Sequence, residues 1–229
     1  MRVDPLVSAH EAEGRARRAL REVCRFLDER GLIVATDGNV SVRLDDGDLL
    51  ITPAGRCKRT LSPLDMVRTD PEGKPRGASR PSSEIGLHLA IYRHRPDARA
   101  IIHAHPPVAI AHTVAGVSLA DPLMPEALVE LGRVPTLPLV QPGTEAMGQQ
   151  LELPVQEHDV MMLERHGSVT LGPNLRVALT RLEFLEQAAK VSFHARLLAA
   201  GPVEALPEGL QSALTSSPSA PASSDANRS

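Results

Sequence analysis

The sequence predicts a single α/β protein whose sheet is substantially antiparallel. Helical and strand patterns are mixed along the whole chain rather than separated into two halves. Two strand patterns are joined by the tight turn at 45–48, which is typical of a hairpin. The other patterns do not follow the regular alternation expected of a parallel sheet. A length of 229 residues, 42% of them hydrophobic, suits one domain with a tail.

The first half of the chain begins with a long helix, because apolar residues recur at helical spacing and Gly31 follows where a C-terminal cap belongs. Alternating apolar and polar residues then predict short strands on either side of the hairpin turn. The elements expected here are a helix at 8–30, strands at 40–44 and 49–52, a helical turn at 62–65, a strand at 66–68 and an exposed loop at 71–81.

The second half alternates more evenly between helices and strands. Ser83 is expected to cap a helix that Pro96 ends, and two prolines place one later strand at a sheet edge. The expected elements are helices at 84–94, from 107, at 143–153 and at 175–200, and strands at 100–105, 134–140, 159–163 and 169–172. Residues 207–229 are rich in Ser, Ala and Pro, which predicts a disordered tail after a domain at 1–206.

Composition excludes several classes of function. The net charge of −3, with no Trp, one Tyr and three Phe, argues against nucleic-acid binding and against an anionic membrane surface. No segment has the ~20 apolar residues of a membrane span, and the first residues lack a signal-peptide core. Two cysteines are too few for a disulfide framework. We expect a cytoplasmic protein.

Three histidines are candidate metal ligands. His103 and His105 lie two apart at the end of a strand, so their side chains point to one face. His166 follows another strand and precedes Gly167, which allows close backbone approach. Three imidazoles leave one tetrahedral position open, the arrangement of catalytic Zn²⁺ sites. A lone histidine is more often a hydrogen-bonded structural residue, as we expect for His112.

Polar residues near these histidines suggest further roles. Glu84 is either an ordinary first-turn acid or, beside a metal, a proton shuttle. Ser82 and Ser83 either cap the helix or help to bind an anion at its N-terminus. The turn Gly38-Asn39 is either a second anion cradle or simply a turn.

Six motifs resemble the class II aldolase/adducin family and occur in its order. They are TDGNVSVR (36–43), ITPAG (51–55), PSSE (81–84), HAHPP (103–107), PGT (142–144) and RHG (165–167). The likeness covers about residues 10–200, and its pattern is nearest to that of the L-fuculose-phosphate aldolases. It implies a three-layer α/β/α domain with a central, mostly antiparallel sheet, assembled as a homotetramer with the active site between subunits.

The resemblance also implies roles for individual residues. His103, His105 and His166 would bind Zn²⁺ or another divalent metal, and Glu84 would be the catalytic acid/base. The positions that match the family's phosphate site are Thr36, Gly38, Asn39, Ser82 and Ser83. The implied reaction cleaves a small phosphorylated ketose, such as fuculose 1-phosphate, to dihydroxyacetone phosphate and an aldehyde.

The chain departs from the family pattern in two places. Ala54 stands where a hydroxyl residue is expected in the phosphate site. The family's aldolases use a tyrosine from a neighbouring subunit, yet 121–134 has none, and we expect Tyr92 to serve in packing. Glu126, Glu130 or water would then have to protonate the alkoxide.

These departures leave other activities open. A decarboxylase, dehydratase or epimerase of sugar phosphates could use the same histidines, and an adducin-like binding module would need none of them. Arg56, Lys58 and Arg59 could bind an anionic substrate, but a solvated basic loop is the interpretation that we favour from sequence.

Overall fold

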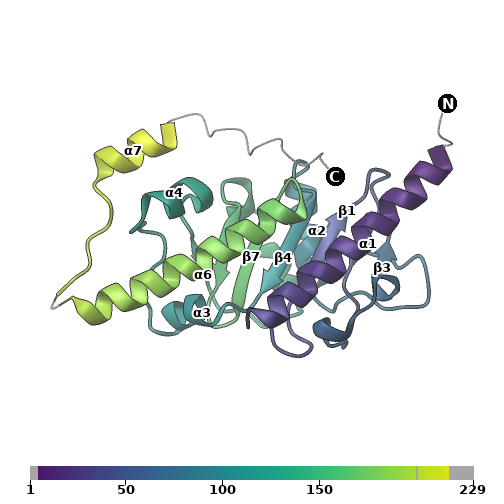
Figure 1. The fold of residues 1–229 in the computed structure, drawn as a ribbon, viewed down its shortest axis with the longest axis horizontal. Coiled ribbons are helices and arrows are strands. Elements are labelled where there is room, and N and C mark those ends of the chain that lie inside the picture. The colour runs from purple at the N-terminus through teal and green to yellow at the C-terminus, as the bar shows by residue number, and fades with distance from the viewer. Residues whose placement is uncertain (1–4, 200, 217–229) are drawn as a thin grey trace.

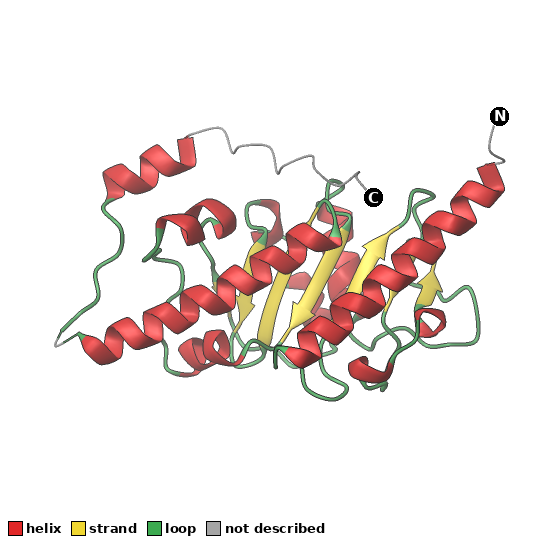
Figure 2. Ribbon diagram, in the orientation of Figure 1, coloured by secondary structure: helices red, strands yellow, loops and turns green. Residues whose placement is uncertain are grey.

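The computed structural model describes residues 5–199 and 201–216. Its centre is a seven-stranded sheet in the order β3-β2-β1-β4-β7-β6-β5, shown as yellow arrows in Figure 2. All neighbouring strands are antiparallel except β5 and β6. The strands are β1 (Asn39–Arg43), β2 (Leu49–Ile51), β3 (Val67–Thr69), β4 (Ala100–Ala104), β5 (Thr136–Leu137), β6 (Val160–Leu163) and β7 (Gly167–Gly172).

Helices cover both faces of this sheet, so the fold has the three layers that the family resemblance implies. The long helices α1 (Pro5–Glu29) and α6 (Leu175–Leu198) lie across one face, with α3 (Pro107–Val114) and α4 (Pro125–Leu131) beside α6 (Figure 1). The short helices α2 (Ile85–His94) and α5 (Glu145–Gln149) cover the other face.

Strand β4 shows how the two faces are built. Ala100 and Ile102 belong to the apolar core under α1 and α6, whereas Ile101 belongs to the second core under α2 and α5. Successive side chains of a strand point to opposite faces, so His103 shares the α2 face with Ile101. A fully buried polar side chain therefore lies at the end of an apolar strand.

The register of the sheet brings three strand ends together. His103 pairs with Asn39 at the start of β1 and with Val169 near the start of β7. The turn that carries His166 immediately precedes β7. Segments far apart in sequence therefore meet at one edge of the sheet, next to the beginning of α2.

Three local predictions differ from the structure, and one helix was not predicted. The strand expected at 134–140 is only β5, at the sheet edge, since its prolines cannot donate ladder hydrogen bonds. The helix expected at 143–153 is the shorter α5. Helix α4 was not expected. Glu84, not Ser83, is the N-cap residue of α2, and the Glu84 side chain makes no capping bond.

The tail also differs in part from the prediction. Residues Glu208–Ser216 form helix α7, which lies beside α4. The preceding segment is anchored by a hydrogen bond of 2.9 Å from the Leu206 amide to the Pro122 carbonyl. The rest of the predicted tail, 217–229, lies outside the described residues. Among the helices of the described chain, none is long and apolar enough to cross a membrane.

Candidate active site

The three predicted histidines converge at the end of β4. The Nε2 atom of His103 lies 3.2 Å from His105 Nε2 and 3.1 Å from His166 Nε2. One ligand atom from each imidazole falls within 4.8 Å of the others. His103 is fully buried, while the side chains of His105 and His166 are 19% and 15% exposed. The cluster is therefore accessible to solvent on the side of His105 and His166.

This donor set fits a divalent cation. Tetrahedral Zn²⁺ with Zn–N bonds of about 2.0–2.1 Å would hold two ligand nitrogens about 3.3 Å apart. His103 Nδ1–H donates to the Ser168 carbonyl at 2.9 Å, which leaves the Nε2 lone pair directed into the cluster. Burial lowers the pKa of His103 and lowers that of His105 to about 4, so both imidazoles are neutral at pH 7, as ligands must be.

Gly167 allows this convergence. A Cβ atom at this position would lie 2.5 Å from the Ala104 carbonyl oxygen, 2.8 Å from His105 Cδ2 and 3.0 Å from His103 Cε1. Only a residue without a side chain fits there. The preceding Arg165 has a positive φ of 55°, and its amide donates to Thr113 Oγ1 at 2.9 Å, which fixes the turn that holds His166.

Glu84 lies beside the cluster. Its Oε2 is 3.4 Å from His103 Nε2, and its Oε1 is 3.3 Å from His166 Nε2. Asn39 Nδ2 donates to Oε2 at 2.7 Å. Burial opposes ionisation of Glu84, but the His166 hydrogen bond, the positive charge of His103 in its protonated form and the Asn39 amide outweigh burial and lower the pKa of Glu84 to about 2. In the free protein this carboxyl group is an ionised base.

A cleft of about 370 Å³ opens onto this cluster. It gathers eight of the nine candidate residues, and only His103 lies behind its wall. Its lining consists of Thr36, Asp37, Gly38, Asn39, Pro53, Ala54, Gly55, Lys58, Ser82, Ser83, Glu84, His105, Pro142, Gly143 and His166. Backbone amides, hydroxyl groups and one ammonium group thus surround a space that can hold a small polar molecule.

The predicted phosphate residues differ in what they offer to this cleft. Ser83 and Thr36 are exposed, and Ser82 Oγ accepts from the Glu84 amide at 3.3 Å. Gly38 has a φ of 69°, and a Cβ there would lie 2.6 Å from Ile33 Cγ2. The Asn39 side chain is engaged with Glu84 and His88 rather than free.

Lys58 corrects the interpretation of the basic loop. Arg59 is 69% exposed, as predicted for a solvated loop, but Lys58 is only 3% exposed. Lys58 Nζ donates to the Thr36 carbonyl at 2.5 Å and to the Arg56 carbonyl at 3.2 Å. Burial lowers the pKa of this ammonium group, and the charges of Asp37 and Glu84 act against that shift. Lys58 is thus a buried cation in the wall of the cleft.

His88 was also missed from the sequence. It is fully buried on α2, where it contacts Asn39 and Ser41. The signal that could have found it is the spacing of Glu84, His88 and Tyr92, which puts three polar groups on one helix face at intervals of four residues.

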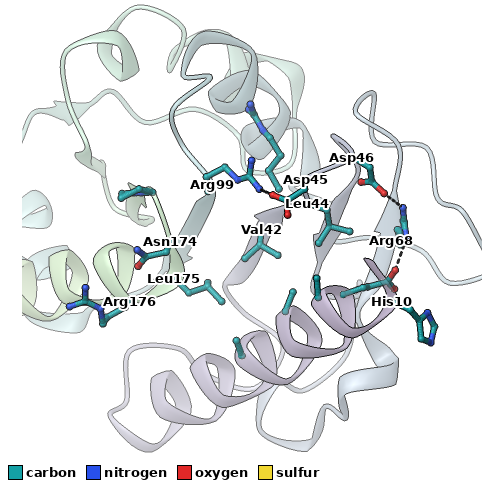
Figure 3. A pocket seen from close by; sticks show the side chains of 16 residues that line it. His10, Val42, Leu44, Asp45, Asp46, Arg68, Arg99, Asn174, Leu175 and Arg176 are labelled. Carbon is teal, nitrogen blue, oxygen red and sulfur yellow. Dashed lines mark hydrogen bonds and ion pairs between the residues drawn. The ribbon is translucent and has the colours of Figure 1, made fainter. Parts of the chain in front are cut away.

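A larger hollow of about 1100 Å³ lies elsewhere, between α1, the β1–β2 hairpin and the start of α6. Figure 3 shows its apolar floor, with Val42, Leu44 and Leu175, and its charged rim. Two ion pairs join charges of this rim, Asp45 with Arg99 and Asp46 with Arg68. None of the candidate ligands lines this hollow, so the smaller cleft is the candidate active site.

Comparison with known proteins agrees with this fold. Residues 18–193 match the class II aldolase and adducin N-terminal domain. The chain is 33% identical over 186 residues to 3-oxo-tetronate 4-phosphate decarboxylase from Pectobacterium atrosepticum, covering 80% of this chain and 85% of that protein. It is 31% identical over 185 residues to L-fuculose phosphate aldolase from Haemophilus influenzae, covering 79% and 82%.

A solved structure is also similar. The crystal structure of YgbL from Escherichia coli superposes with a TM-score of 0.83 at 29% identity, covering 90% of this chain and 100% of that chain. Since the family match spans most of the chain, the protein belongs to the class II aldolase and adducin family.

Proposed function

We propose that this protein is a metal-dependent decarboxylase of a small phosphorylated 3-oxo sugar acid. The main observation behind this proposal is the cluster of three imidazoles with a single carboxylate beside it. The Glu84 oxygens lie 3.3 Å from His166 Nε2 and 3.4 Å from His103 Nε2, and no tyrosine lines the cleft. The chain's single tyrosine, Tyr92, is buried on α2, in agreement with the packing role expected from the sequence. Similarity to 3-oxo-tetronate 4-phosphate decarboxylases, such as that from Pectobacterium atrosepticum, supports this choice.

The chemistry of that substrate class suits the site. In a 3-oxo-tetronate 4-phosphate, the carboxylate C1 leaves as CO₂ and the electron pair of the C1–C2 bond moves toward the C3 carbonyl. A proton then adds at C2, which gives dihydroxyacetone phosphate. Only this one carbon needs a proton, so one acid/base is sufficient. We assign that role to Glu84, which would carry the proton from solvent.

The three histidines would hold the metal, for which we propose Zn²⁺. When bound, such an ion is a Lewis acid that stabilises negative charge developing on the substrate oxygens. The cleft residues would hold the other end of the substrate. Lys58 supplies a buried positive charge for the phosphate, next to the amides of the turn at 36–38 and the hydroxyl groups of Ser82 and Ser83.

An aldolase acting on a phosphorylated ketose is the second candidate. Aldol cleavage could leave the same triose phosphate in the same half of the cleft, and the similarity to L-fuculose phosphate aldolase favours it. Cleavage of a C–C bond to an aldehyde also requires proton transfer at the oxygen of the departing half. The chain has no accessible tyrosine for that second transfer, because its single tyrosine, Tyr92, is buried.

One assay separates the two candidates. The metal-loaded protein is incubated with 3-oxo-tetronate 4-phosphate and, separately, with fuculose 1-phosphate, and CO₂ and dihydroxyacetone phosphate are measured. Release of both products from the first substrate supports the decarboxylase. Dihydroxyacetone phosphate from fuculose 1-phosphate alone, without CO₂ from the other, supports the aldolase. No product from either substrate contradicts both proposals.

A further inference from the structure

A continuous line of hydrogen bonds runs from Glu84 into the core between α2 and β1. Asn39 Nδ2 donates to Glu84 Oε2 at 2.7 Å, and Asn39 Oδ1 contacts His88 Nε2. On the other side of the ring, His88 Nδ1 lies 2.7 Å from Ser41 Oγ. Ser41 Oγ lies in turn 2.9 Å from the hydroxyl of Tyr92. These five side chains form one chain of contacts, which we call the Glu84 relay.

Chemistry fixes the direction of every bond in the relay. Asn39 places its amide nitrogen 2.7 Å from Glu84 Oε2, and an amide nitrogen can only donate. The Asn39 oxygen then faces His88 and can only accept, so His88 Nε2 must carry the proton. A neutral imidazole has one N–H, so Nδ1 accepts from the Ser41 hydroxyl, which accepts from Tyr92.

Burial makes this arrangement rigid. His88 is fully buried and Tyr92 is 6% exposed, while Asn39 and Ser41 are 2% and 0% exposed. Desolvation lowers the pKa of His88 to about 3, so the ring is neutral at any pH near 7. No water can replace a lost partner without opening the core, and an unpaired group there is costly.

We infer that His88 is a positioning residue for Glu84, acting through Asn39. By donating from Nε2 it prevents the Asn39 amide from turning its oxygen toward the carboxylate. The amide nitrogen therefore always holds Glu84 Oε2, at one fixed place beside the histidine cluster. This inference rests on the proposed role of Glu84 as the acid/base. It adds the requirement that His88, which does not touch the substrate, is protonated on Nε2.

The first test locates the proton directly. Neutron diffraction from deuterium-exchanged crystals of the metal-loaded protein distinguishes the two ring nitrogens of a buried histidine. We expect deuterium on His88 Nε2 and none on Nδ1. Deuterium on Nδ1, or an Asn39 amide with its oxygen toward Glu84, would overturn the inference whatever the enzyme's substrate proves to be.

The second test measures the consequence. The His88→Met variant loses the Nε2–H donor, while the side chain keeps a similar volume. We expect kcat to fall about tenfold to hundredfold, as it does for other groups that orient a catalytic side chain. KM and metal content should stay unchanged. In His88→Gln the amide can still donate to Asn39, so most of the lost kcat should return. His112→Met is the matched control, because it removes another buried histidine, 5% exposed and outside the cleft.

The outcomes separate this inference from the proposed function. If kcat of His88→Met equals that of His112→Met, His88 does not position Glu84. If His88→Met does not fold, the His88→Gln variant and the neutron map of the natural protein decide the question. If Glu84→Gln retains full turnover, the proposed function of Glu84 fails instead, even where the map finds the predicted tautomer.

Discussion

His103 and His166 bring their Nε2 atoms within 3.1 Å of each other, although 63 residues separate them in the chain. The pairing of β4 with β7 explains this approach, since His103 lies opposite Val169, three residues after His166. Neither histidine is held by local structure alone. The candidate metal centre is therefore a property of the sheet register, and it forms only when the domain folds.

Removal of one imidazole should remove the metal. We expect His166→Ala to lose nearly all bound divalent metal and all activity, because two neutral ligands rarely hold a catalytic ion. The metal-to-protein ratio measured by plasma mass spectrometry, together with circular dichroism, checks this. His194→Ala is the control, because His194 is exposed on α6. This variant should keep its bound metal. A full complement of metal in His166→Ala would refute the ligand assignment.

Glu84→Gln should separate metal binding from proton transfer. The amide keeps the shape of the carboxylate, so the metal content should stay unchanged, while kcat should fall about 10²–10⁴-fold through loss of the acid/base. Steady-state kinetics and metal analysis on the same sample give both quantities. Turnover equal to that of the natural protein would exclude Glu84 from the mechanism.

The sequence was sufficient to predict what depends on local pattern. The spacing of His103 and His105 predicts their shared face, and the hairpin predicts the antiparallel sheet. Lys58 could not be predicted in this way, because it belongs to a basic run and becomes buried only through contacts with the carbonyls of Thr36 and Arg56. In α7, the Ser- and Ala-rich composition concealed a helix that lies beside α4.

Lys58→Met should weaken binding of phosphorylated substrates. A hydrogen bond from a charged donor contributes about 1.5–3 kcal/mol, so kcat/KM should fall by about 10- to 150-fold, chiefly through KM. Arg59→Met is the matched control, because it removes the neighbouring positive charge from a side chain that is 69% exposed. Equal values of KM for the two variants would show that position 58 contributes no specific charge.

Gly167→Ala should disrupt the histidine cluster. The added Cβ would lie 2.5 Å from the Ala104 carbonyl oxygen and 2.8 Å from His105 Cδ2, so backbone or ring must move. Overpacking of this kind costs about 1–3 kcal/mol of stability, and we expect metal affinity to fall with it. Gly86→Ala on α2 is the control, because no atom lies within 4 Å of its added Cβ. Metal titrations that give the same affinity for both variants would contradict this account of Gly167.

The stability of the metal-free protein should depend on His88 between pH 7 and pH 5. Its pKa is lowered by burial from 6.5 to about 3, so in this range the unfolded chain binds a proton that the folded protein does not. The contribution of His88 is fully present above pH 6.5 and decreases as the pH falls toward 3, by about 1.4 kcal/mol per pH unit.

Urea unfolding at pH 7 and pH 5 measures this effect. His88→Gln cannot titrate, so its free energy of unfolding should decrease by about 2 kcal/mol less than that of the natural protein over this interval. His105, whose pKa is also lowered by burial, to about 4, contributes equally to both proteins and cancels. His194→Gln removes an exposed imidazole and should follow the natural protein. Parallel decreases for all three would mean that His88 also binds a proton in the folded state, contrary to the effect expected from its burial.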